Sequence, residues 1–383
     1  MNGRERVKAV LERKVPDLVP TDMWGSASRI HNDLYFKILK ILDIKDKGDI
    51  IRPNQVTSYE NYELADLLGC DFRHINPGKP DYFTSYKDEK GFVFDEWGIG
   101  RDYSAMYPTI AVFPFENFDE SEIKKHKWPI MHDEGRIRGL ADKAKDWHEN
   151  TDKAITATAA NSGLFFELGQ FLRGPEQFFM DLVLNENLVH TMFDKLTELF
   201  IELNLYYLKP VAPYIEWVEF SSDLGTQNGM FFSKEMFNTF FKKPYIDLFS
   251  AIKKEYPHLK IFYHCCGSIY DLIPDLIEVG VDILNPIQPL AFDMDPARIK
   301  KEFGDSLVFH GAIDIQNAMR GSIEDVKSEV RLRIDQMGGG GGYIVSPNNH
   351  LLPDIPPENV ICMYQYAKEY GNYQVSDSAF QRG

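Results

Sequence analysis

Short apolar runs alternate with longer segments of helical periodicity through the second half of the chain. The apolar runs lie at 217–220, 261–263, 281–284, 307–309 and 343–345. The helical segments that follow them lie at 234–255, 269–279, 295–303, 323–337 and 357–370. Runs that are short and apolar on both faces are typical of parallel strands covered by helices. The pattern therefore predicts an α/β fold with a parallel sheet.

The first half repeats this pattern less regularly, behind an amphipathic helix expected at 1–14. Further strands are expected at 17–24, 70–75 and 155–160, and further helices at 35–42, 62–68, 163–172, 175–184 and 187–208. The segment 118–150 is dense in charge, which predicts surface helices without a deep core. About eight β/α units fit in the chain with no linker between them, so we expect a single (β/α)8 TIM barrel with extra N-terminal helices.

An open doubly wound sheet is the alternative architecture. It is disfavoured because no Gly-x-Gly-x-x-Gly motif follows the first expected strand. The five consecutive glycines at 338–342 precede a strand, so they are better explained as the end of a helix than as a phosphate-binding loop.

One stretch departs from the β/α pattern. The alternating, aromatic-rich residues 82–107, with Lys90-Gly91 between two extended segments, predict a β-hairpin inserted in a loop of the barrel. We expect one domain over 1–375, followed by a C-terminal tail at 376–383. The acidic surface and the exposed hairpin around Gly91 would permit a homodimer.

Composition excludes several classes of partner. Lys and Arg total 42 against 58 Asp and Glu, a net charge of -16, and no basic cluster stands out, so no nucleic-acid partner is expected. No apolar stretch approaches the roughly 18 to 20 residues of a membrane span, and the N-terminus lacks the apolar core of a signal peptide. Four cysteines, two of them adjacent, disfavour a disulfide framework. We expect a cytoplasmic protein.

Polar residues gather where the expected strands end. In a barrel these ends converge on one face, which carries the active site. The residues are Asp22, His74, Asn161, Asp223, His264, Cys266, Asn285, Gln288, His310, Asp314, Asn348, Asn349 and His350.

His264 and Cys266 are the strongest candidates for metal ligands. They are two residues apart at the end of a strand, so both side chains point the same way, while Cys265 points to the opposite face and packs as a small apolar residue. A histidine and a cysteine so placed could hold one Zn²⁺, which in catalytic sites takes a third protein ligand and keeps one position open. Asp223, His310, Asn349 and His350 are the candidates for the third ligand, and the sequence does not choose among them. The alternative is that His264 and both thiols belong to the core.

Three residues are candidates for proton transfer. Asp223 follows a strand directly and is either a general base or metal ligand at the barrel mouth, or an aspartate that caps a turn. His310 and Asp314 could pair as an acid and the carboxylate that orients it, although Gly311 between them could serve only a tight backbone.

Three motifs together resemble the uroporphyrinogen decarboxylase superfamily. They are Gly311-Ala-Ile-Asp314, Asn285-Pro-Ile-Gln288 and Pro353-Asp-Ile-Pro-Pro-Glu-Asn359. The resemblance implies a (β/α)8 barrel and two branches of activity, the haem-pathway decarboxylases and the zinc-dependent corrinoid methyltransferases.

The chain is more similar to the methyltransferase branch. The decarboxylases carry a loop whose arginines hold substrate carboxylates, and the corresponding residues 23–29 retain only Arg29. The methyltransferases carry His-x-Cys-Gly, which His264-Cys-Cys-Gly267 matches, and their third zinc ligand corresponds to Asn349, with His350 beside it. The resemblance thus implies Zn²⁺ held by His264 and Cys266. The expected third ligand is His350, which would substitute after a one-residue shift; Asp223 closing the site, or no zinc at all, are the alternatives.

The function expected from this resemblance is transfer of a methyl group between a small donor or thiol acceptor and a corrinoid. No Asp-x-His-x-x-Gly corrinoid motif is present, so a partner corrinoid protein would carry that cofactor. Asp223, His310 and Asp314 are the expected catalytic residues, and substrate binding is expected of Asp22, Arg29, Asn285, Gln288 and Asn349. Decarboxylation of uroporphyrinogen, or corrinoid or tetrapyrrole binding without turnover, are the alternatives.

Overall fold

A computed structural model describes residues 1–373 apart from 26–27, 54, 106 and 162. The expected C-terminal tail at 376–383 lies outside the described residues. No helix in the described part of the chain combines the length and the apolar composition that crossing a membrane requires.

Seven parallel strands form the central sheet, and each of them coincides with a strand predicted from the apolar runs. Their order across the sheet is β3, β8, β9, β12, β13, β14 and β15. The strands are β3 (Phe72–Ile75), β8 (Ala154–Ala157), β9 (Trp217–Ser221), β12 (Lys260–His264), β13 (Ile283–Asn285), β14 (Val308–Ile313) and β15 (Tyr343–Pro347).

The expected strand at 17–24 closes the sheet into a barrel, although only a few of its residues pair. On one side Val345 donates to the Pro20 carbonyl at 2.9 Å, and Asp22 donates to the Val345 carbonyl at 3.0 Å. On the other side Asp71, which directly precedes β3, donates to the Thr21 carbonyl at 2.9 Å. The segment therefore bridges the two edge strands, and the predicted (β/α)8 barrel is confirmed.

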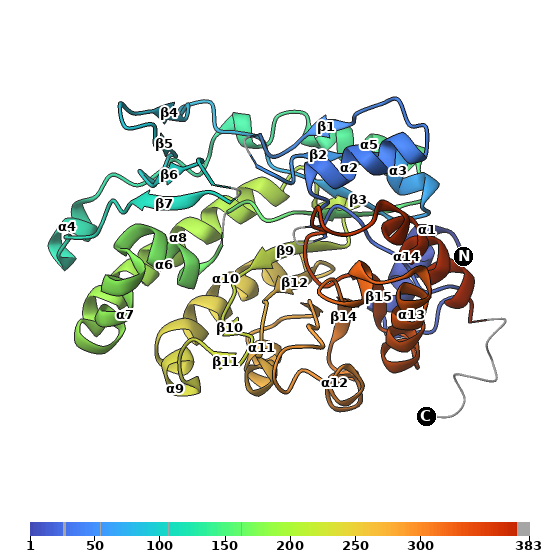
Figure 1. Cartoon of the computed structure of the whole chain (residues 1–383). Helices are drawn as coiled ribbons and strands as arrows, with labels where there is room; N and C mark the ends of the chain where they lie inside the picture. Colours follow the sequence, from blue (N-terminus) through green and yellow to red (C-terminus); the bar gives the residue numbers. More distant parts are fainter. Residues whose placement is uncertain (26–27, 54, 106, 162, 374–383) are drawn as a thin grey trace.

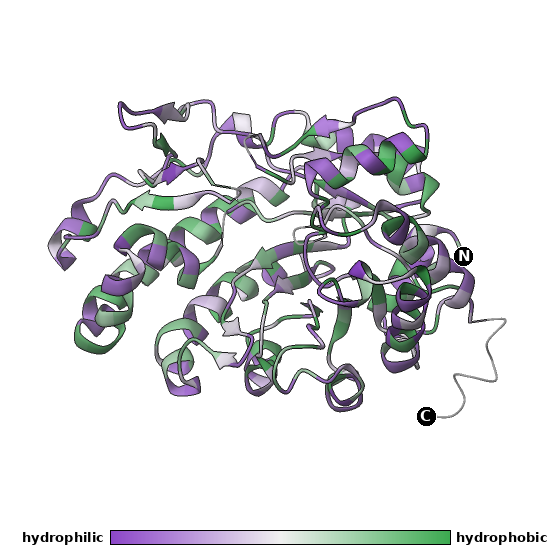
Figure 2. Cartoon of the chain, in the orientation of Figure 1, coloured by the Kyte–Doolittle hydropathy of each residue, from purple (hydrophilic) through white to green (hydrophobic). Residues whose placement is uncertain are grey.

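Helices surround the barrel (Figure 1), and hydrophilic and hydrophobic bands alternate along them (Figure 2). Most of the residues that they bury are apolar. The helices are α1 (Gly3–Leu11), α2 (Asn32–Ile41), α3 (Tyr62–Leu67), α5 (Leu140–Asn150), α6 (Phe165–Arg173), α7 (Pro175–Leu184), α8 (Glu186–Leu208), α10 (Lys242–Glu255), α11 (Ile273–Glu278), α12 (Pro296–Phe303), α13 (Ile323–Met337) and α14 (Pro357–Tyr370).

The helix expected at 234–255 is interrupted. It consists of α9 (Lys234–Met236), a π-helical segment Phe237–Phe241, and α10. Pro244 has no N–H to donate to the carbonyl four residues earlier, which accounts for irregular helix geometry just before it.

The inserted region is larger than the hairpin expected at 82–107. It is a four-stranded antiparallel sheet of β4 (Tyr86–Lys87), β5 (Val93–Phe94), β6 (Gly100–Asp102) and β7 (Thr109–Val112). The fourth strand comes from Thr109-Ile-Ala-Val112, a run of high β propensity beyond the expected range. The sheet and the short helix α4 (Glu120–Lys125) lie on the side of α6 and α8 (Figure 1).

Two layers of side chains fill the barrel. The lower layer is apolar and packs on Val7, Val10 and Leu11 of α1; it consists of Phe72, Ala154, Trp217, Phe262, Ile283, Val308 and Ile344. Two residues further along each strand is a second inward-facing residue, because alternate side chains share one face. These residues form what we call the polar layer: His74, Thr156, Glu219, His264, Asn285, His310 and Ser346, all buried. The polar layer is the floor of the candidate site.

Candidate active site

Three potential metal ligands converge at the mouth of the barrel. They are His264, the last residue of β12, Cys266 just beyond it, and Asp223, two residues after β9. These strands are neighbours, with His264 paired to Ser221, which brings the loop after β9 to the cysteine. His264 Nε2 lies 3.3 Å from Cys266 Sγ and 3.5 Å from Asp223 Oδ1.

The donor atoms of this metal triad suit zinc. The imidazole nitrogen, sulfur and carboxylate oxygen all lie within 4.8 Å of one another, and Zn²⁺ commonly takes such mixed ligands while a catalytic site keeps a fourth position open. Of the four candidates left open by the sequence, the structure brings Asp223 to the pair.

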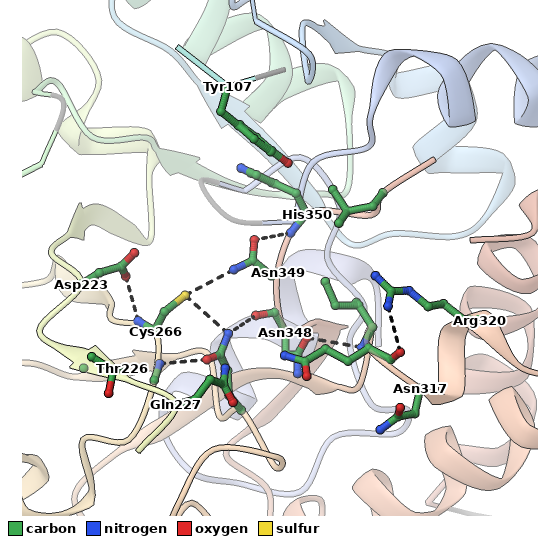
Figure 3. Close-up of a pocket in the computed structure, with 16 residues that line it drawn as sticks. Tyr107, Asp223, Thr226, Gln227, Cys266, Asn317, Arg320, Asn348, Asn349 and His350 are labelled. Carbon is green, nitrogen blue, oxygen red and sulfur yellow. Dashed lines mark hydrogen bonds between the residues drawn. The ribbon is translucent and has the colours of Figure 1, made fainter. Parts of the chain in front are cut away.

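The sulfur of Cys266 accepts hydrogen bonds from two side-chain amides (Figure 3). Asn349 donates to it through Nδ2 at 3.3 Å, and Gln288 through Nε2 at 3.5 Å. The Cys266 amide donates to Asp223 Oδ1 at 2.8 Å. Burial, followed by the charge of Asp223, raises the pKa of the Cys266 thiol. A thiolate here therefore needs a cation beside it, which a metal bound by the triad would supply.

His350, the expected third ligand, lies outside the metal triad. Its Nδ1 accepts a hydrogen bond from the Arg29 amide at 3.2 Å, and its own amide donates to Asn349 Oδ1 at 2.7 Å. Burial, followed by the positive charges of Arg52 and Arg29, lowers the pKa of His350 well below its usual value. At neutral pH the His350 imidazole is therefore uncharged.

A cavity of about 720 Å³ opens above the metal triad. Asp223, Cys266, Gln288, Asn349 and His350 line it, and Tyr107 from the inserted region reaches over it (Figure 3). A second cavity of about 540 Å³ shares Asp223 with the first. The triad thus lies where two cavities meet.

The second cavity is lined by charged groups of both signs. They are the guanidinium groups of Arg29 and Arg52 and the carboxyl groups of Asp223 and Glu167. Arg29 is only 1% exposed and pairs with Glu60 at 2.6 Å, yet its Nε and Nη1 have no hydrogen-bond partner among the described residues. Burial, followed by the charge of Arg29, lowers the pKa of Arg52 to about 9. Arg29 and Arg52 are adjacent cations, and Arg29 has unused hydrogen-bond donors, so together they could bind an anionic group of a ligand.

Glu167, which no sequence pattern singled out, supports Asp223. Its carboxylate accepts a hydrogen bond from the Ser222 hydroxyl at 2.6 Å and another from the Asp223 amide. Burial, followed by the charge of Asp223, raises the pKa of Glu167 to about 7. Glu167 lies inside the periodic segment expected as a helix, where a single glutamate carries no signal. Thr156, Glu219 and Arg52 were also missed, and for the first two the signal was the alternation of apolar and polar residues along their strands.

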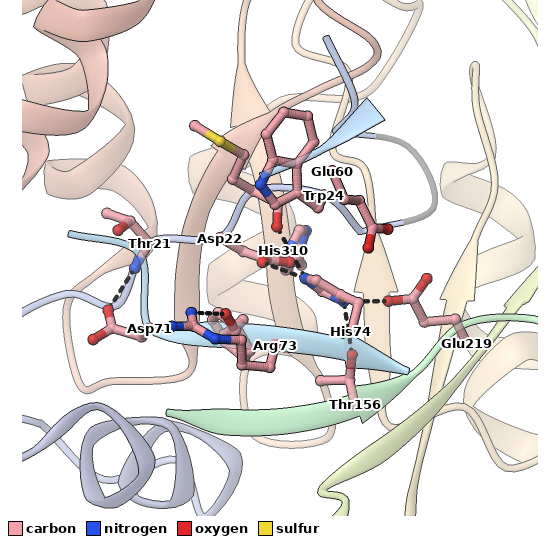
Figure 4. Close-up of polar contacts among 12 residues, drawn as sticks. Thr21, Asp22, Trp24, Glu60, Asp71, Arg73, His74, Thr156, Glu219 and His310 are labelled. Atoms are coloured by element: carbon pink, nitrogen blue, oxygen red, sulfur yellow. Dashed lines mark hydrogen bonds and ion pairs between the residues drawn. The ribbon is translucent and has the colours of Figure 1, made fainter. Parts of the chain in front are cut away.

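Asp22 and His310 lie below the cavities, at 1% and 2% exposure. Asp22 bonds His74 Nε2 through one oxygen and His310 Nε2 through the other, each at 2.9 Å (Figure 4). Burial alone would raise the pKa of Asp22, but the two histidines lower it to about 2. Burial alone would lower the pKa of His74, but Asp22 and then Glu219 raise it to about 10.

The expected pairing of His310 with Asp314 is wrong. The Asp314 carboxylate accepts hydrogen bonds from the amides of Gln316, Asn317 and Ala318 at 2.8 to 3.3 Å, so it caps a turn. The orienting carboxylate of His310 is Asp22 instead. Residues four apart share a face of a strand but are roughly 13 Å apart along it. Asp314 also lies beyond the end of β14, where its carboxylate bonds the amides of the following turn.

Asn285 and Gln288 have different places although both belong to one motif. Asn285 is in the polar layer, bonded to His264 Nδ1 at 2.6 Å. Gln288 lines the first cavity, where its Oε1 accepts a hydrogen bond from the Gly267 amide at 2.8 Å.

Comparison with solved structures agrees with the barrel. A methyltransferase from Methanosarcina mazei superposes with a TM-score of 0.68, covering 97% of this chain and 99% of that one at 15% identity. This likeness shows the shared fold.

Sequence comparison identifies the family. Uroporphyrinogen decarboxylase of Chlorobaculum tepidum is 26% identical over 133 residues, 34% of this chain and 36% of that protein. The enzyme of Rickettsia felis is 26% identical over 137 residues, 36% of this chain and 38% of that protein. These alignments thus span little more than a third of either relative. The family described as Uroporphyrinogen decarboxylase (URO-D) matches residues 99–370, most of the chain, and the protein belongs to this family.

Proposed function

We propose that this protein is a zinc-dependent methyltransferase that moves a methyl group between a small substrate and a corrinoid carried by a partner protein. The observation that carries the proposal is the convergence of Asp223, His264 and Cys266 at the barrel mouth, beneath a cavity of about 720 Å³. The fold it shares with a methyltransferase agrees with this function.

Asp223 Oδ1, His264 Nε2 and Cys266 Sγ would hold the metal. Bound there, Zn²⁺ would act as a Lewis acid that holds a substrate thiol as thiolate or polarises the group to which the methyl is attached. The amides of Gln288 and Asn349 point their N–H groups at the Cys266 sulfur, so they stabilise its negative charge. Glu167 holds the loop of Asp223 in place.

Arg29 and Arg52 would orient the substrate. Their cavity joins that of the metal triad at Asp223, so a molecule with an anionic group near the arginines can present its other end to the triad. Tyr107, from the inserted region, and His350 line the cavity at that end.

Decarboxylation of uroporphyrinogen is the second candidate, favoured by the named activity of the sequence relatives and by the two arginines. It requires no metal triad. The substrate carries eight carboxylates, for which two arginines are few.

Metal content and activity together test the proposal. We expect purified protein to contain about one zinc per chain by mass spectrometry, and the variants His264→Ala and Cys266→Ser to contain less than a tenth of that. Cys362→Ser, which changes a thiol remote from the site, is the matched control and should retain the metal. Demethylation of methylcobalamin with a panel of small thiols, followed by absorbance, measures turnover.

Two results would contradict the proposal. One is zinc-free protein that acquires none when supplied with it. The other is formation of coproporphyrinogen at equal rates by the wild type and by His264→Ala, which would establish the decarboxylase instead.

A further inference from the structure

The side chain of Asn285 joins the metal triad to the rest of the polar layer. It is 1% exposed and lies between two histidines, His264 on β12 and His310 on β14. Its Oδ1 is 2.6 Å from His264 Nδ1, and its Nδ2 is 2.8 Å from His310 Nδ1.

A backbone carbonyl fixes which way this amide points. Asn285 Nδ2 lies 3.2 Å from the His310 carbonyl oxygen, which can only accept a hydrogen bond. The NH2 group must therefore face His310, and the oxygen must face His264. Because Oδ1 can only accept, His264 Nδ1 must carry a hydrogen, and Nε2 is left as the nitrogen that faces Cys266 and Asp223.

The directions of the hydrogen bonds are fixed in the same way from Asn285 to His74. Asn285 donates its second hydrogen to His310 Nδ1, so the hydrogen of neutral His310 sits on Nε2 and is donated to Asp22 at 2.9 Å. The other Asp22 oxygen faces His74 Nε2, which must also carry a hydrogen because it lies 3.0 Å from the Met23 carbonyl (Figure 4). Every link from His74 to His264 therefore has one permitted direction.

Gly311 provides the room for this arrangement. Its φ is +100°, and a Cβ at this position would lie 3.2 Å from Asn285 Nδ2. A side chain here would push against the amide that faces His264.

We propose that Asn285 is a positioning residue that fixes the ring orientation and the Nδ1–H tautomer of the metal ligand His264, and that the chain His310–Asp22–His74 holds Asn285 in place. The proposal rests on the proposed function only in that the triad binds a metal. It gives Asp22 and His310 a structural role behind the metal instead of the catalytic or substrate-binding roles expected from the sequence. Outer partners of this kind typically change metal affinity by about 10- to 100-fold.

The test compares zinc affinity and histidine tautomers in three variants. Asn285→Leu keeps the branched shape of the side chain but removes the acceptor, and we expect zinc affinity, measured by competition with a chelator, to fall about 10- to 100-fold. Asn285→Asp restores an acceptor to His264 Nδ1 and should stay within about threefold of the wild type. Asn204→Leu, a buried asparagine on α8 whose Nδ2 bonds the Phe200 carbonyl, is the matched control and should leave affinity unchanged.

Nitrogen NMR of histidine-labelled protein supplies a readout that needs neither metal nor activity. The His264 signals, assigned by their loss in His264→Gln, should show the Nδ1–H form in wild type and in Asn285→Asp, and a mixture of tautomers in Asn285→Leu. Zinc affinity in Asn285→Leu equal to wild type, with the same tautomer, would overturn the proposal.

The two proposals can fail separately. If wild-type protein binds no zinc, the proposed function fails, while the tautomer of His264 still tests the positioning role. If Asn285→Leu does not fold, Asn285→Asp decides: a tenfold loss of affinity, or loss of the Nδ1–H form, in folded Asp variant contradicts the role of the acceptor.

Discussion

The two layers inside the barrel differ in chemistry although they are built by the same strands. The lower layer, which includes Phe72, Trp217 and Phe262, is apolar and sealed by α1. The polar layer, only two residues further along each strand, holds His74, Glu219 and His264 in a hydrogen-bonded network. Burial is nearly complete in both, so exposure does not separate them. What separates them is whether the buried atoms gain stability by leaving water or must find polar partners.

The two layers therefore have different roles. Burial of apolar side chains in the lower layer stabilises the barrel. Burial of each polar group in the polar layer costs free energy unless its hydrogen bonds are made. Hydrogen bonds among residues of the polar layer hold their side chains in one arrangement. That arrangement includes the contact of Asn285 with His264 of the metal triad. Substitutions in the two layers should therefore affect different measurements.

The largest effect is expected at the metal triad itself. His264→Ala would remove one of the three proposed zinc ligands. If the proposed function holds, loss of the Lewis acid would cost several kcal/mol of transition-state stabilisation, so activity should fall on the order of 10³-fold or more. The rate of methylcobalamin demethylation measures this loss of activity. His258→Ala changes an exposed histidine whose Nε2 lies beside the Ala212 carbonyl; it is the control and should keep full activity.

A substitution in the lower layer should instead reduce stability and leave metal binding intact. Trp217→Ala removes a fully buried ring that packs against Phe72 and Phe262, with centroids 5.0 and 5.6 Å away. The free energy of unfolding should fall by about 3 to 5 kcal/mol, measured by denaturant titration, while folded protein still binds zinc. Loss of zinc binding by protein that remains folded would show that the two layers are not independent.

The arginine pair should affect substrate binding more than chemistry. Arg52→Ala removes a cation that has no ion pair among the described residues, and KM for an anionic substrate should rise about 10- to 100-fold, as for a lost charged hydrogen bond. A neutral analogue should show no such change. Arg138→Ala, which removes an exposed arginine paired with Asp81, is the control.

The pH dependence of stability should show the smallest effect. The folded pKa of His74, about 10, lies above its unfolded value near 6.5, so its contribution is fully present below about pH 6.5 and is lost as pH rises towards 10. The pKa of Asp22 is lowered from 3.8 to about 2, so its contribution is present above about pH 4 and is lost as pH falls through 2.

Denaturant titrations from pH 5 to pH 10 measure this effect. His74→Gln should give a flatter curve than the wild type on the alkaline side, whereas His190→Gln, on the outer helix α8, should follow the wild type. Parallel curves for His74→Gln and the wild type would show that His74 is uncharged in the folded protein.

The sequence was sufficient to predict the elements of the fold. Strands such as β9 and β12 were predicted because their apolar runs are short, continuous and followed by helical periodicity. The pairing of His264 with Cys266, and the exclusion of Cys265 from the site, followed from the two-residue period of a strand. The four-stranded insertion was underestimated because its strands are two to four residues long and its last strand lies beyond the aromatic stretch.

Local order along the chain thus determined the barrel, its polar mouth and two of the three residues of the metal triad, because strand and helix periodicity are properties of neighbouring residues. Only the tertiary structure decided that Asp223 completes the triad while His350 lies outside it, and that His310 bonds Asp22, 288 residues away in the sequence, instead of nearby Asp314. Asp223 reaches the triad because β9 pairs with β12, and His310 reaches Asp22 because the segment 17–24 closes the barrel beside β15. The direction of each side chain at that closure depends on the register of strands that are far apart in the chain, and no pattern within a single segment contains it.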